Sequence, residues 1–502
     1  MEELALTSTT WLFLVLSISL FAVLLSTASR RSSNKALLPP GPPPLLFVAK
    51  FIALRRSIFD LGPLLRDLHA RHGPIISVRL ARTLVFVTDR TLAHRVLVQG
   101  GATFADRPPL SEPAFFFSSG ARAINTAPYG AYWRLVRRNL VEALSPTRIA
   151  LFAPARRHVR DMLVRDLRER GGDGSRVVEV RPSLRRALFE LHVYMSLSVS
   201  LGPEALDELE ELQLWMLRSF TSFPVFAFFS AFTKRLFRKR WAAHVAVRRR
   251  VEEIYIPLIN ARRAGDGDDR PCYADSLLPL RVAEEGDRPL TDAEVVTLCS
   301  EFLNGGTDTT VTLVEWIMAE LVNHPDVQAK VYDEVRSTPG LSEGDLQAMP
   351  YLKAVVREAL RLHPPSHFLL PHGVQSDSEI GGYKVPKGTE LNFLVAEFGR
   401  DEAVWTAARE FRPERFLEGG EGHDVDIMGI REIKMMPFGA GRRMCPGYTL
   451  GTLHAEYLVG SLVRELEWLP AAEGEVADMT ERLDFTTVMK HPLRARIVPR
   501  LP

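Results

Sequence analysis

Apolar residues recur with helical spacing along most of the chain. A period near 3.6 residues gives one apolar face to each of several long segments, which is typical of amphipathic helices packed on a core. The clearest of these segments are 131–144, 205–220, 241–262, 293–323 and 351–362. The pattern predicts a helix-rich body.

Strand signals are confined to two short zones. Residues 79–88 contain the β-favouring run Leu84-Val85-Phe86-Val87 and predict a strand pair. Residues 380–398 predict further short strands, because glycine and proline turns interrupt them. No repeat of 20–50 residues is visible. The fold class we expect is therefore mainly α with small β-sheets.

The first 30 residues contain a long uncharged run, from Leu4 to about Ala28. About 20 residues of helix span a bilayer core. We expect residues 1–30 to be an uncleaved, single-pass transmembrane helix that serves as a membrane anchor. A cleaved secretory signal is the alternative, but the run is long and no basic segment precedes it. Acidic residues precede the run and basic residues follow it, which places the body in the cytosol: Glu2 and Glu3, then Arg30, Arg31 and Lys35.

Residues 31–44 are basic and then proline-rich, ending in Pro39-Pro40-Gly41-Pro42-Pro43-Pro44. Proline fixes φ and lacks an amide donor, so the run favours an extended, semi-rigid segment. We expect a hinge between the anchor and a body at 45–502, with an ordinary linker as the alternative.

Composition narrows the possible functions. The 502 residues include 63 Lys and Arg against 61 Asp and Glu, a net charge of +2, so no global nucleic-acid footprint exists. Three cysteines, Cys272, Cys299 and Cys445, are too few for a disulfide scaffold, and their scarcity agrees with a cytosolic body.

Residues 218–232 are rich in phenylalanine, and residues 234–250 are strongly basic. An apolar tip beside a basic face suits contact with an anionic membrane surface. A buried helix junction followed by a solvated helix face is an equally good interpretation.

One cysteine stands in a glycine-rich setting. Glycines let the backbone approach a bound group closely, and a helix N-terminus after Cys445 favours a thiolate. A single sulfur cannot form a zinc site but can be the axial ligand of a haem iron. The pattern F-x-x-G-x-R-x-C-x-G, met by Phe438, Gly441, Arg443, Cys445 and Gly447, resembles the haem-thiolate signature of the cytochrome P450 superfamily. The amino-acid sequence of this segment is most similar to that of plant microsomal members.

This resemblance implies a cytochrome P450 fold, with 45–502 forming one large haem-thiolate catalytic domain. It implies haem b (iron protoporphyrin IX) as cofactor and Cys445 as the metal ligand. Cys272 and Cys299 are expected to be inert core residues.

Glu358 and Arg361 lie three residues apart in a predicted helix and share one face. Together with Arg415, in the segment Phe411-Arg412-Pro413-Glu414-Arg415-Phe416, they resemble the family's buried structural triad. Removing one member of a buried ion cluster is expected to prevent folding or haem loading.

Two consecutive glycines interrupt the predicted helix 293–323 at Gly305-Gly306-Thr307-Asp308-Thr309-Thr310. Glycine costs helix stability, so room for a ligand is a plausible reason for its use. Thr309 can donate to a preceding carbonyl and bend the helix. The segment resembles the family's oxygen-activation motif, which gives Asp308 and Thr309 the catalytic acid and alcohol roles. Gly305 stands where alanine is usual.

Trp133 and Arg137 face the same side of a predicted helix at i,i+4. In the family this helix binds the haem propionates. Arg443 and His372 occupy further expected propionate positions, and Phe438 and Gly447 flank the cofactor loop.

The resemblance implies a monooxygenase that inserts one atom of O₂ into a lipophilic organic substrate. NADPH is expected to supply electrons through a separate membrane reductase, because no G-x-G-x-x-G follows a strand. Arg134 and Arg138 are candidates for docking that reductase, with a solvated face as the alternative. The resemblance also implies location at the endoplasmic reticulum membrane.

Substrate-facing residues are expected in three places, forming an apolar pocket: Phe115 and Phe116; Glu301, Phe302 and Gly305; Leu369 and Leu370. Two other functions remain open, a haem-thiolate isomerase or dehydratase and a non-catalytic membrane haem-binding protein. The intact Asp308-Thr309 pair argues against the isomerase.

Overall fold

The computed structural model describes residues 38–44, 46–47, 62–80, 82–222, 224–227, 229–265, 270–338 and 340–500. The expected anchor at 1–30 and the hinge residues 31–37 lie outside this part of the chain. Within the described residues, no helix has the length and apolar character needed to cross a membrane.

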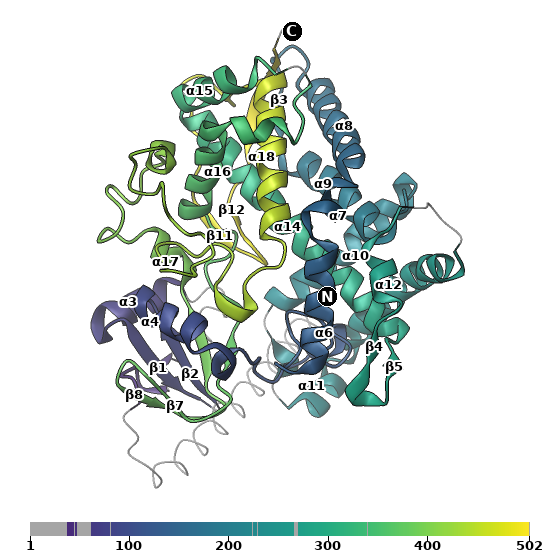
Figure 1. The fold of residues 1–502 in the computed structure, drawn as a ribbon, viewed down its shortest axis with the longest axis vertical. Coiled ribbons are helices and arrows are strands. Elements are labelled where there is room, and N and C mark those ends of the chain that lie inside the picture. The colour runs from purple at the N-terminus through teal and green to yellow at the C-terminus, as the bar shows by residue number, and fades with distance from the viewer. Residues whose placement is uncertain are drawn as a thin grey trace, which may run out of the picture.

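Helices make up most of the described body (Figure 1). They are α3 Gly62–His72, α4 Arg90–His94, α5 Ala114–Phe117, α6 Ala131–Ala143, α7 Pro146–Ala150, α8 Ala153–Gly171, α9 Arg181–Leu197, α10 Pro203–Thr221, α11 Ser230–Leu236, α12 Arg238–Ala264, α13 Tyr273–Leu277, α14 Asp292–Asn323, α15 Pro325–Val335, α16 Pro350–Leu362, α17 Val395–Gly399 and α18 Tyr448–Glu465.

The strands form small, separate sheets. The largest has the order β1-β2-β9-β6 and a second has the order β10-β13-β3, while β11-β12, β4-β5 and β7-β8 are two-stranded. Their bounds are β1 Ile75–Arg79, β2 Thr83–Val87, β3 Val177–Glu179, β4 Arg281–Val282, β5 Arg288–Pro289, β6 His372–Gly373, β7 Ser378–Ile380, β8 Tyr383–Val385, β9 Glu390–Phe393, β10 Leu466–Pro470, β11 Glu481–Leu483, β12 Thr487–Met489 and β13 Arg494–Pro499.

The long helix α14 runs through the middle of the molecule, between α9 and α18. Its first turn carries a capping box in which Thr291 and Glu294 satisfy each other's backbone amides. Most of its residues are buried on every side, as expected for a helix with neighbours all around. This helix positions the glycine motif inside the protein.

The predicted elements agree closely with the observed ones. Each of the five predicted helices has an observed counterpart, α6, α10, α12, α14 and α16, whose ends differ by at most three residues. The strand pair 79–88 is the hairpin β1-β2, which begins earlier, at Ile75. The zone 380–398 contains β8 and β9, but its last residues form α17 rather than a strand. That turn is buried against α16, so packing overrides its β-like composition.

The proline-rich segment lies against the body rather than standing free. Ser77 of β1 donates its amide to the carbonyl of Pro40 at 2.8 Å and its hydroxyl to that of Pro39 at 2.6 Å. A Cβ on Gly41 would lie 1.8 Å from the Ser77 carbonyl oxygen, so only glycine allows this close approach. The described end of the expected hinge, residues 38–44, is therefore docked.

The phenylalanine-rich segment divides between the core and the surface. Phe226 is buried and packs edge-on against Trp241 of α12, which matches the buried-junction interpretation. Phe229 and Phe232 are about half exposed, as an apolar tip requires.

Candidate functional site

The loop around Cys445 is fixed by glycines and one backbone bond. Gly439 and Gly441 have φ of 72° and 70°, in the left-handed region. A Cβ on Gly441 would lie 1.9 Å from the carbonyl oxygen of Leu97, so no larger residue fits. The Cys445 amide donates to the Phe438 carbonyl at 2.8 Å, which closes the loop before α18 begins.

The environment of the Cys445 thiol combines opposing effects on its pKa. Burial raises its pKa, and the Gly447 amide and the Arg137 charge oppose this only in part. The Gly447 amide, next to the start of α18, and the Arg137 charge are the two groups that favour the thiolate form. A thiolate is the form of cysteine that ligates a metal, so these two groups favour metal binding through the sulfur.

The two consecutive glycines of α14, Gly305 and Gly306, are needed for different structural reasons. A Cβ on Gly306 would lie 2.4 Å from Nε2 of His192 on α9, so Gly306 allows close helix packing. A Cβ on Gly305 would meet nothing within 4 Å, although the surrounding helix is buried. Glu301 and Thr309 lie one turn before and after Gly305 on the same face. This face leaves room for a bound group.

Thr309 and Asp308 point in different directions. The Thr309 hydroxyl donates to the Gly305 carbonyl at 2.7 Å, the back-bond that its position predicted. The Asp308 carboxylate is directed at Arg185 of α9 instead, and its Oδ2 is buried without a hydrogen-bond partner among the described residues. Burial raises the pKa of Asp308, while Arg185 and Arg181 counteract this.

Arginines converge beside the cysteine loop. Arg137 donates to the Met444 carbonyl. Arg443 donates to the carbonyls of Ala105 and Ala127, each at 2.7 Å. The guanidinium of Arg443 lies 4.4 Å from the ring centroid of Trp133. Arg443 therefore lies on Trp133 and near Arg137, while the Trp133 indole donates to the Ile124 carbonyl at 3.2 Å.

Arg107 belongs to the same group, and the sequence reasoning missed it. It donates to the carbonyls of Asn125, Leu370 and Pro371 at 2.7–2.9 Å. Only its place in a loop next to Asp106 could have drawn attention to it. Burial and the nearby Arg443 lower the pKa of Arg107 to about 9, and burial lowers that of Arg443 to about 10. Buried cations that destabilise one another in this way favour a bound anion.

His372 lies beside this group and is buried. Its Nδ1 is 2.7 Å from the Phe104 carbonyl oxygen and therefore carries the proton. Burial, together with Arg107, lowers its pKa to about 3, so the ring is neutral and acts as a hydrogen-bonding group.

Glu301 ties two segments together and is not solvated. Its carboxylate accepts the amides of Ile124 and Asn125, each at 2.7 Å. Burial raises its pKa to about 7. Its main role in the structure is to hold the 118–130 segment on α14.

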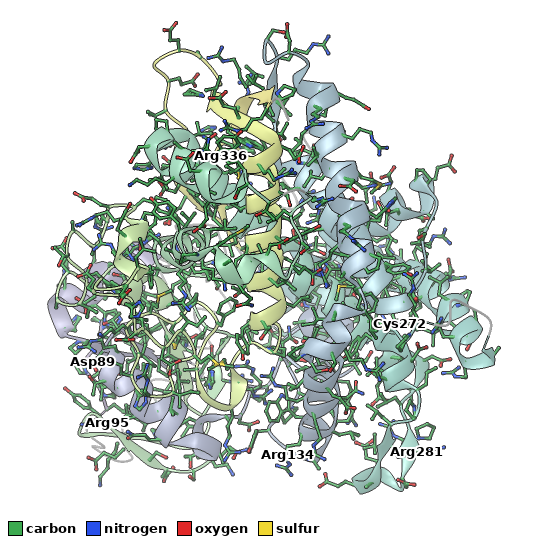
Figure 2. The ribbon with its side chains drawn as sticks, turned by 45° about the horizontal axis from the view of Figure 1, so that its top comes forward. Asp89, Arg95, Arg134, Cys272, Arg281 and Arg336 are labelled. Atoms are coloured by element: carbon green, nitrogen blue, oxygen red, sulfur yellow. The ribbon has the colours of Figure 1, made fainter. Side chains whose placement is uncertain are left out.

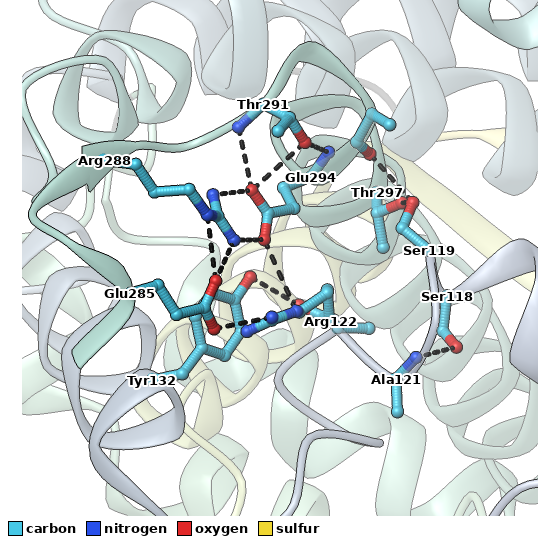
Figure 3. A network of polar contacts seen from close by, with 12 residues as sticks. Ser118, Ser119, Ala121, Arg122, Tyr132, Glu285, Arg288, Thr291, Glu294 and Thr297 are labelled. Atoms are coloured by element: carbon cyan, nitrogen blue, oxygen red, sulfur yellow. Dashed lines mark hydrogen bonds and ion pairs between the residues drawn. The ribbon is translucent and has the colours of Figure 1, made fainter. Parts of the chain in front are cut away.

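A polar network holds the same segment at the start of α14 (Figure 3). Arg122 pairs with Glu285 at 2.6 Å and approaches Glu294 at 3.5 Å, and Arg288 bridges the same two carboxylates. The hydroxyls of Ser119 and Thr297 share a hydrogen bond of 2.7 Å. These contacts hold the 118–130 segment, which covers the Gly305 face of α14.

The expected substrate residues are only partly brought together. Phe115 and Phe116 line an outer pocket of about 440 Å³ against α12 and the start of α14. Phe302 stacks on Tyr273 at 5.0 Å and contacts His192, on the Gly306 face rather than the Gly305 face. Adjacent residues of an α-helix point about 100° apart, so Glu301 and Phe302 face different neighbours. The sequence analysis placed both in one pocket lining and missed this difference.

Leu369 and Leu370 also differ. Leu369 lies 3.3 Å from the Cβ position of Gly439, against the cysteine loop. Leu370 is 45% exposed and contributes its backbone carbonyl to Arg107.

The three triad residues meet beneath this region. Arg361 donates to both oxygens of Glu358, at 2.7 and 2.8 Å, and Arg415 approaches Glu358 at 3.2 Å. The carboxylate also accepts the Arg412 amide, and the two guanidiniums bond to backbone carbonyls. All three side chains are almost fully buried.

Arg134 and Arg138 are exposed on α6, and Figure 2 shows Arg134 at the edge of the molecule. The guanidinium of Arg134 lies 5.7 Å from the Tyr129 ring centroid. Cys272 and Cys299 are buried, and burial raises the pKa of both thiols, to about 11 and about 12.

Known proteins resemble the chain over nearly its full length. The family model described as Cytochrome P450 matches residues 39–498. Cytochrome P450 89A9 of Arabidopsis thaliana is 42% identical over 509 residues, covering 98% of this chain and 99% of the relative. Geraniol 8-hydroxylase of Catharanthus roseus is 31% identical, covering 95% and 97%. A zebra fish cytochrome P450 structure with abiraterone has a TM-score of 0.73 at 24% identity, covering 88% of this chain and 99% of that one.

Proposed function

This chain belongs to the cytochrome P450 family and is a monooxygenase of that family, and we propose that it oxygenates a lipophilic small molecule with electrons from NADPH. The observation that carries the proposal is the meeting of Cys445, the arginine group and the open Gly305 face at one site. The family implies a haem iron cofactor.

The residues present fit that cofactor. Cys445 would hold the iron, and the glycines of its loop allow close approach. Arg137 and Arg443 would hold the propionates, because buried cations suit carboxylates. His372 does not fit the propionate role expected from the sequence, because its one proton is donated to the Phe104 carbonyl and its Nε2 can only accept a hydrogen bond. Haem, when bound, supplies the activation of O₂ and the transfer of one oxygen atom.

The chain's own contribution is orientation and proton supply. Thr309 holds a hydroxyl one turn from the open Gly305 position. Asp308, the preceding residue, holds an unpartnered carboxylate oxygen on the Arg185 side of α14, and burial raises its pKa. Movement of Asp308 from Arg185 towards Thr309 would pass a proton to the reacting face.

The substrate is proposed to enter over Gly305 and Leu369, beneath the segment that Glu301 holds. Relatives named geraniol 8-hydroxylase and flavonoid 3'-monooxygenase, the latter 33% identical and from Crocosmia x crocosmiiflora, act by their names on geraniol and on a flavonoid. A comparable lipophilic substrate is proposed for this chain.

A separate reductase is proposed as the electron donor, docking on the exposed Arg134 and Arg138 of α6. An uncleaved anchor at residues 1–30 would keep the enzyme on the endoplasmic reticulum membrane, facing the cytosol.

The test is reconstitution of the full-length holoenzyme with a purified reductase and NADPH, with a panel of lipophilic compounds first screened by their effect on the haem spectrum. Substrate-dependent NADPH and O₂ consumption in equal amounts, with an oxygenated product, is expected. Conversion of a peroxide without reductase would instead identify an isomerase or dehydratase. Haem binding without either activity would identify a non-catalytic haem protein.

A further inference from the structure

A second cavity, of about 280 Å³, lies between α8 and α18, which run side by side in the upper half of Figure 1. It is lined by α8, by the last turns of α18 and by Leu341. Ser461 lies about 20 Å along the axis of α18 from its start at Tyr448, at 1.5 Å per residue. This cavity is therefore remote from Cys445.

The cavity lining is strongly basic. Four guanidiniums face two carboxylates, which leaves a charge of about +2 at neutral pH: Arg160, Arg165, Arg168 and Arg464 against Asp161 and Glu465. We call this site the α8–α18 arginine cavity.

The two carboxylates are already engaged. Arg160 pairs with Asp161 at 2.6 Å. Arg168 and Arg464 share Glu465. Arg165 is exposed, and in the described part of the chain no carboxylate pairs with it. The excess positive charge is thus not neutralised by the protein around it.

Three polar atoms of the residues that line this cavity are buried and have no hydrogen-bond partner among the described residues. Ser461 is 2% exposed, and its Oγ has no hydrogen-bond partner among the described residues. The Nε atoms of Arg168 and Arg464 are buried and equally unpartnered within the described structure. Buried donors are nearly always paired in folded proteins, so three in one place indicate a missing acceptor.

The favourable placing of cations at helix C-termini does not by itself account for this group of arginines. Arg168 and Arg464 lie in the last turns of their helices, where cations offset the partial negative charge. Arg160 and Arg165 lie earlier on α8, and the hydroxyl of Ser461 is neutral. An acceptor of negative charge explains all five side chains.

We propose that the α8–α18 arginine cavity binds a phosphate monoester dianion. Its two charges balance the excess of the lining, and its oxygens accept from guanidinium forks and from Ser461. A site for one water needs only about 10–15 Å³, so the cavity has room for a polyatomic group. The same group occurs on soluble metabolites and on phosphatidic acid, and both sources share this chemistry.

The test is calorimetric titration of the full-length holoenzyme, in detergent micelles, with inorganic phosphate against chloride at matched ionic strength. Saturable binding of one phosphate per chain is expected. Arg165→Gln should weaken it at least tenfold, and Arg157→Gln, an exposed arginine of α8 outside the cavity, should leave it unchanged. No saturable binding, or equal weakening by both variants, would overturn the proposal.

Ser461→Ala provides an independent readout, because it removes one donor and no charge. It should also weaken phosphate binding while the thermal midpoint without phosphate stays within a few degrees of wild type. Unchanged affinity would overturn the role of this hydroxyl and the proposed pose.

Competition then identifies the source of the bound phosphate group. Displacement of phosphate by glycerol 3-phosphate supports a soluble ligand, and displacement only by phosphatidic acid in the micelles supports a lipid headgroup.

Discussion

Two buried ion clusters in this protein are built in opposite ways. In the cluster of Glu358, Arg361 and Arg415, the carboxylate and both guanidiniums make a full set of hydrogen bonds. In the pair of Asp308 and Arg185, Asp308 Oδ2 and Arg185 Nη2 are buried and unpartnered among the described residues. A saturated cluster resists change, whereas an unsaturated one keeps a site where a proton can bind. The first therefore locks the fold and the second suits chemistry.

The largest effect is expected from breaking the saturated cluster. Arg361→Ala would take the bidentate guanidinium from the buried Glu358 carboxylate, leaving it Arg415 and the Arg412 amide, and would remove the donor to the carbonyls of Gly399 and Ala408. The free energy of unfolding should fall by about 3–5 kcal/mol, a large share of a typical 5–15. Urea unfolding and haem content of the purified variant measure this. A change below about 1 kcal/mol would mean that the cluster is not a lock.

Asp308→Asn should affect turnover instead of folding. The amide keeps the shape and an acceptor for Arg185 but cannot release a proton as a carboxyl does. Product formation with saturating reductase should fall about 100-fold, the lower range for a lost proton donor, with a nearly unchanged thermal midpoint. Glu210→Gln, at the other partner of Arg185, is the matched control and should retain activity. Equal losses in the two variants would assign Asp308 a structural role.

Glu301→Gln tests a third buried carboxyl by pH. Since the pKa of Glu301 is raised from an ordinary 4.5 to about 7, its contribution to stability is present below pH 4.5 and is lost as the pH rises through 7. At 1.36 kcal/mol per pKa unit, the change from 4.5 to about 7 corresponds to a loss of at most about 3 kcal/mol. Urea unfolding at pH 5 and pH 7.5 should show this loss in wild type relative to Glu301→Gln. Parallel pH profiles would contradict it.

The smallest effect is expected at an exposed pair. Lys330 and Glu414 are 2.8 Å apart with both side chains about half exposed. Lys330→Ala should change the free energy of unfolding by less than about 1 kcal/mol, because solvent screens the pair. The same urea measurement serves as the reference for Arg361→Ala. A cost as large as that of Arg361→Ala would remove the distinction between buried and exposed pairs.

Much of this architecture was readable from local sequence. The main helices followed from apolar periodicity, and Thr309 made the back-bond that its place in a helix predicts. What could not be read was the direction of side chains across the fold. Phe302 faces α9 and α13, and Asp308 faces Arg185, a residue 123 positions away that no local pattern connects to it.

The burial of individual side chains was the second property that the sequence did not reveal. The sequence placed Cys445 before a helix, but the cost of desolvating the sulfur depends on the segments that cover it. Glu301 and Arg107 were similarly undervalued, because their partners are backbone atoms of distant loops. No local pattern marks either set of partners.

The parallel pairing of β2 with β9 has a consequence for synthesis of the chain. Val87 pairs with Phe393, a residue that leaves the ribosome about 300 residues later. At roughly 5–20 residues per second, the edge of β2 stays without its partner strand for about 15–60 s. The hairpin β1-β2 is apolar and is buried in the folded protein. During that time the nascent chain therefore exposes an unpaired, aggregation-prone strand edge. We therefore expect its yield in a cell to depend on chaperone protection during translation as well as on the stability of the final fold.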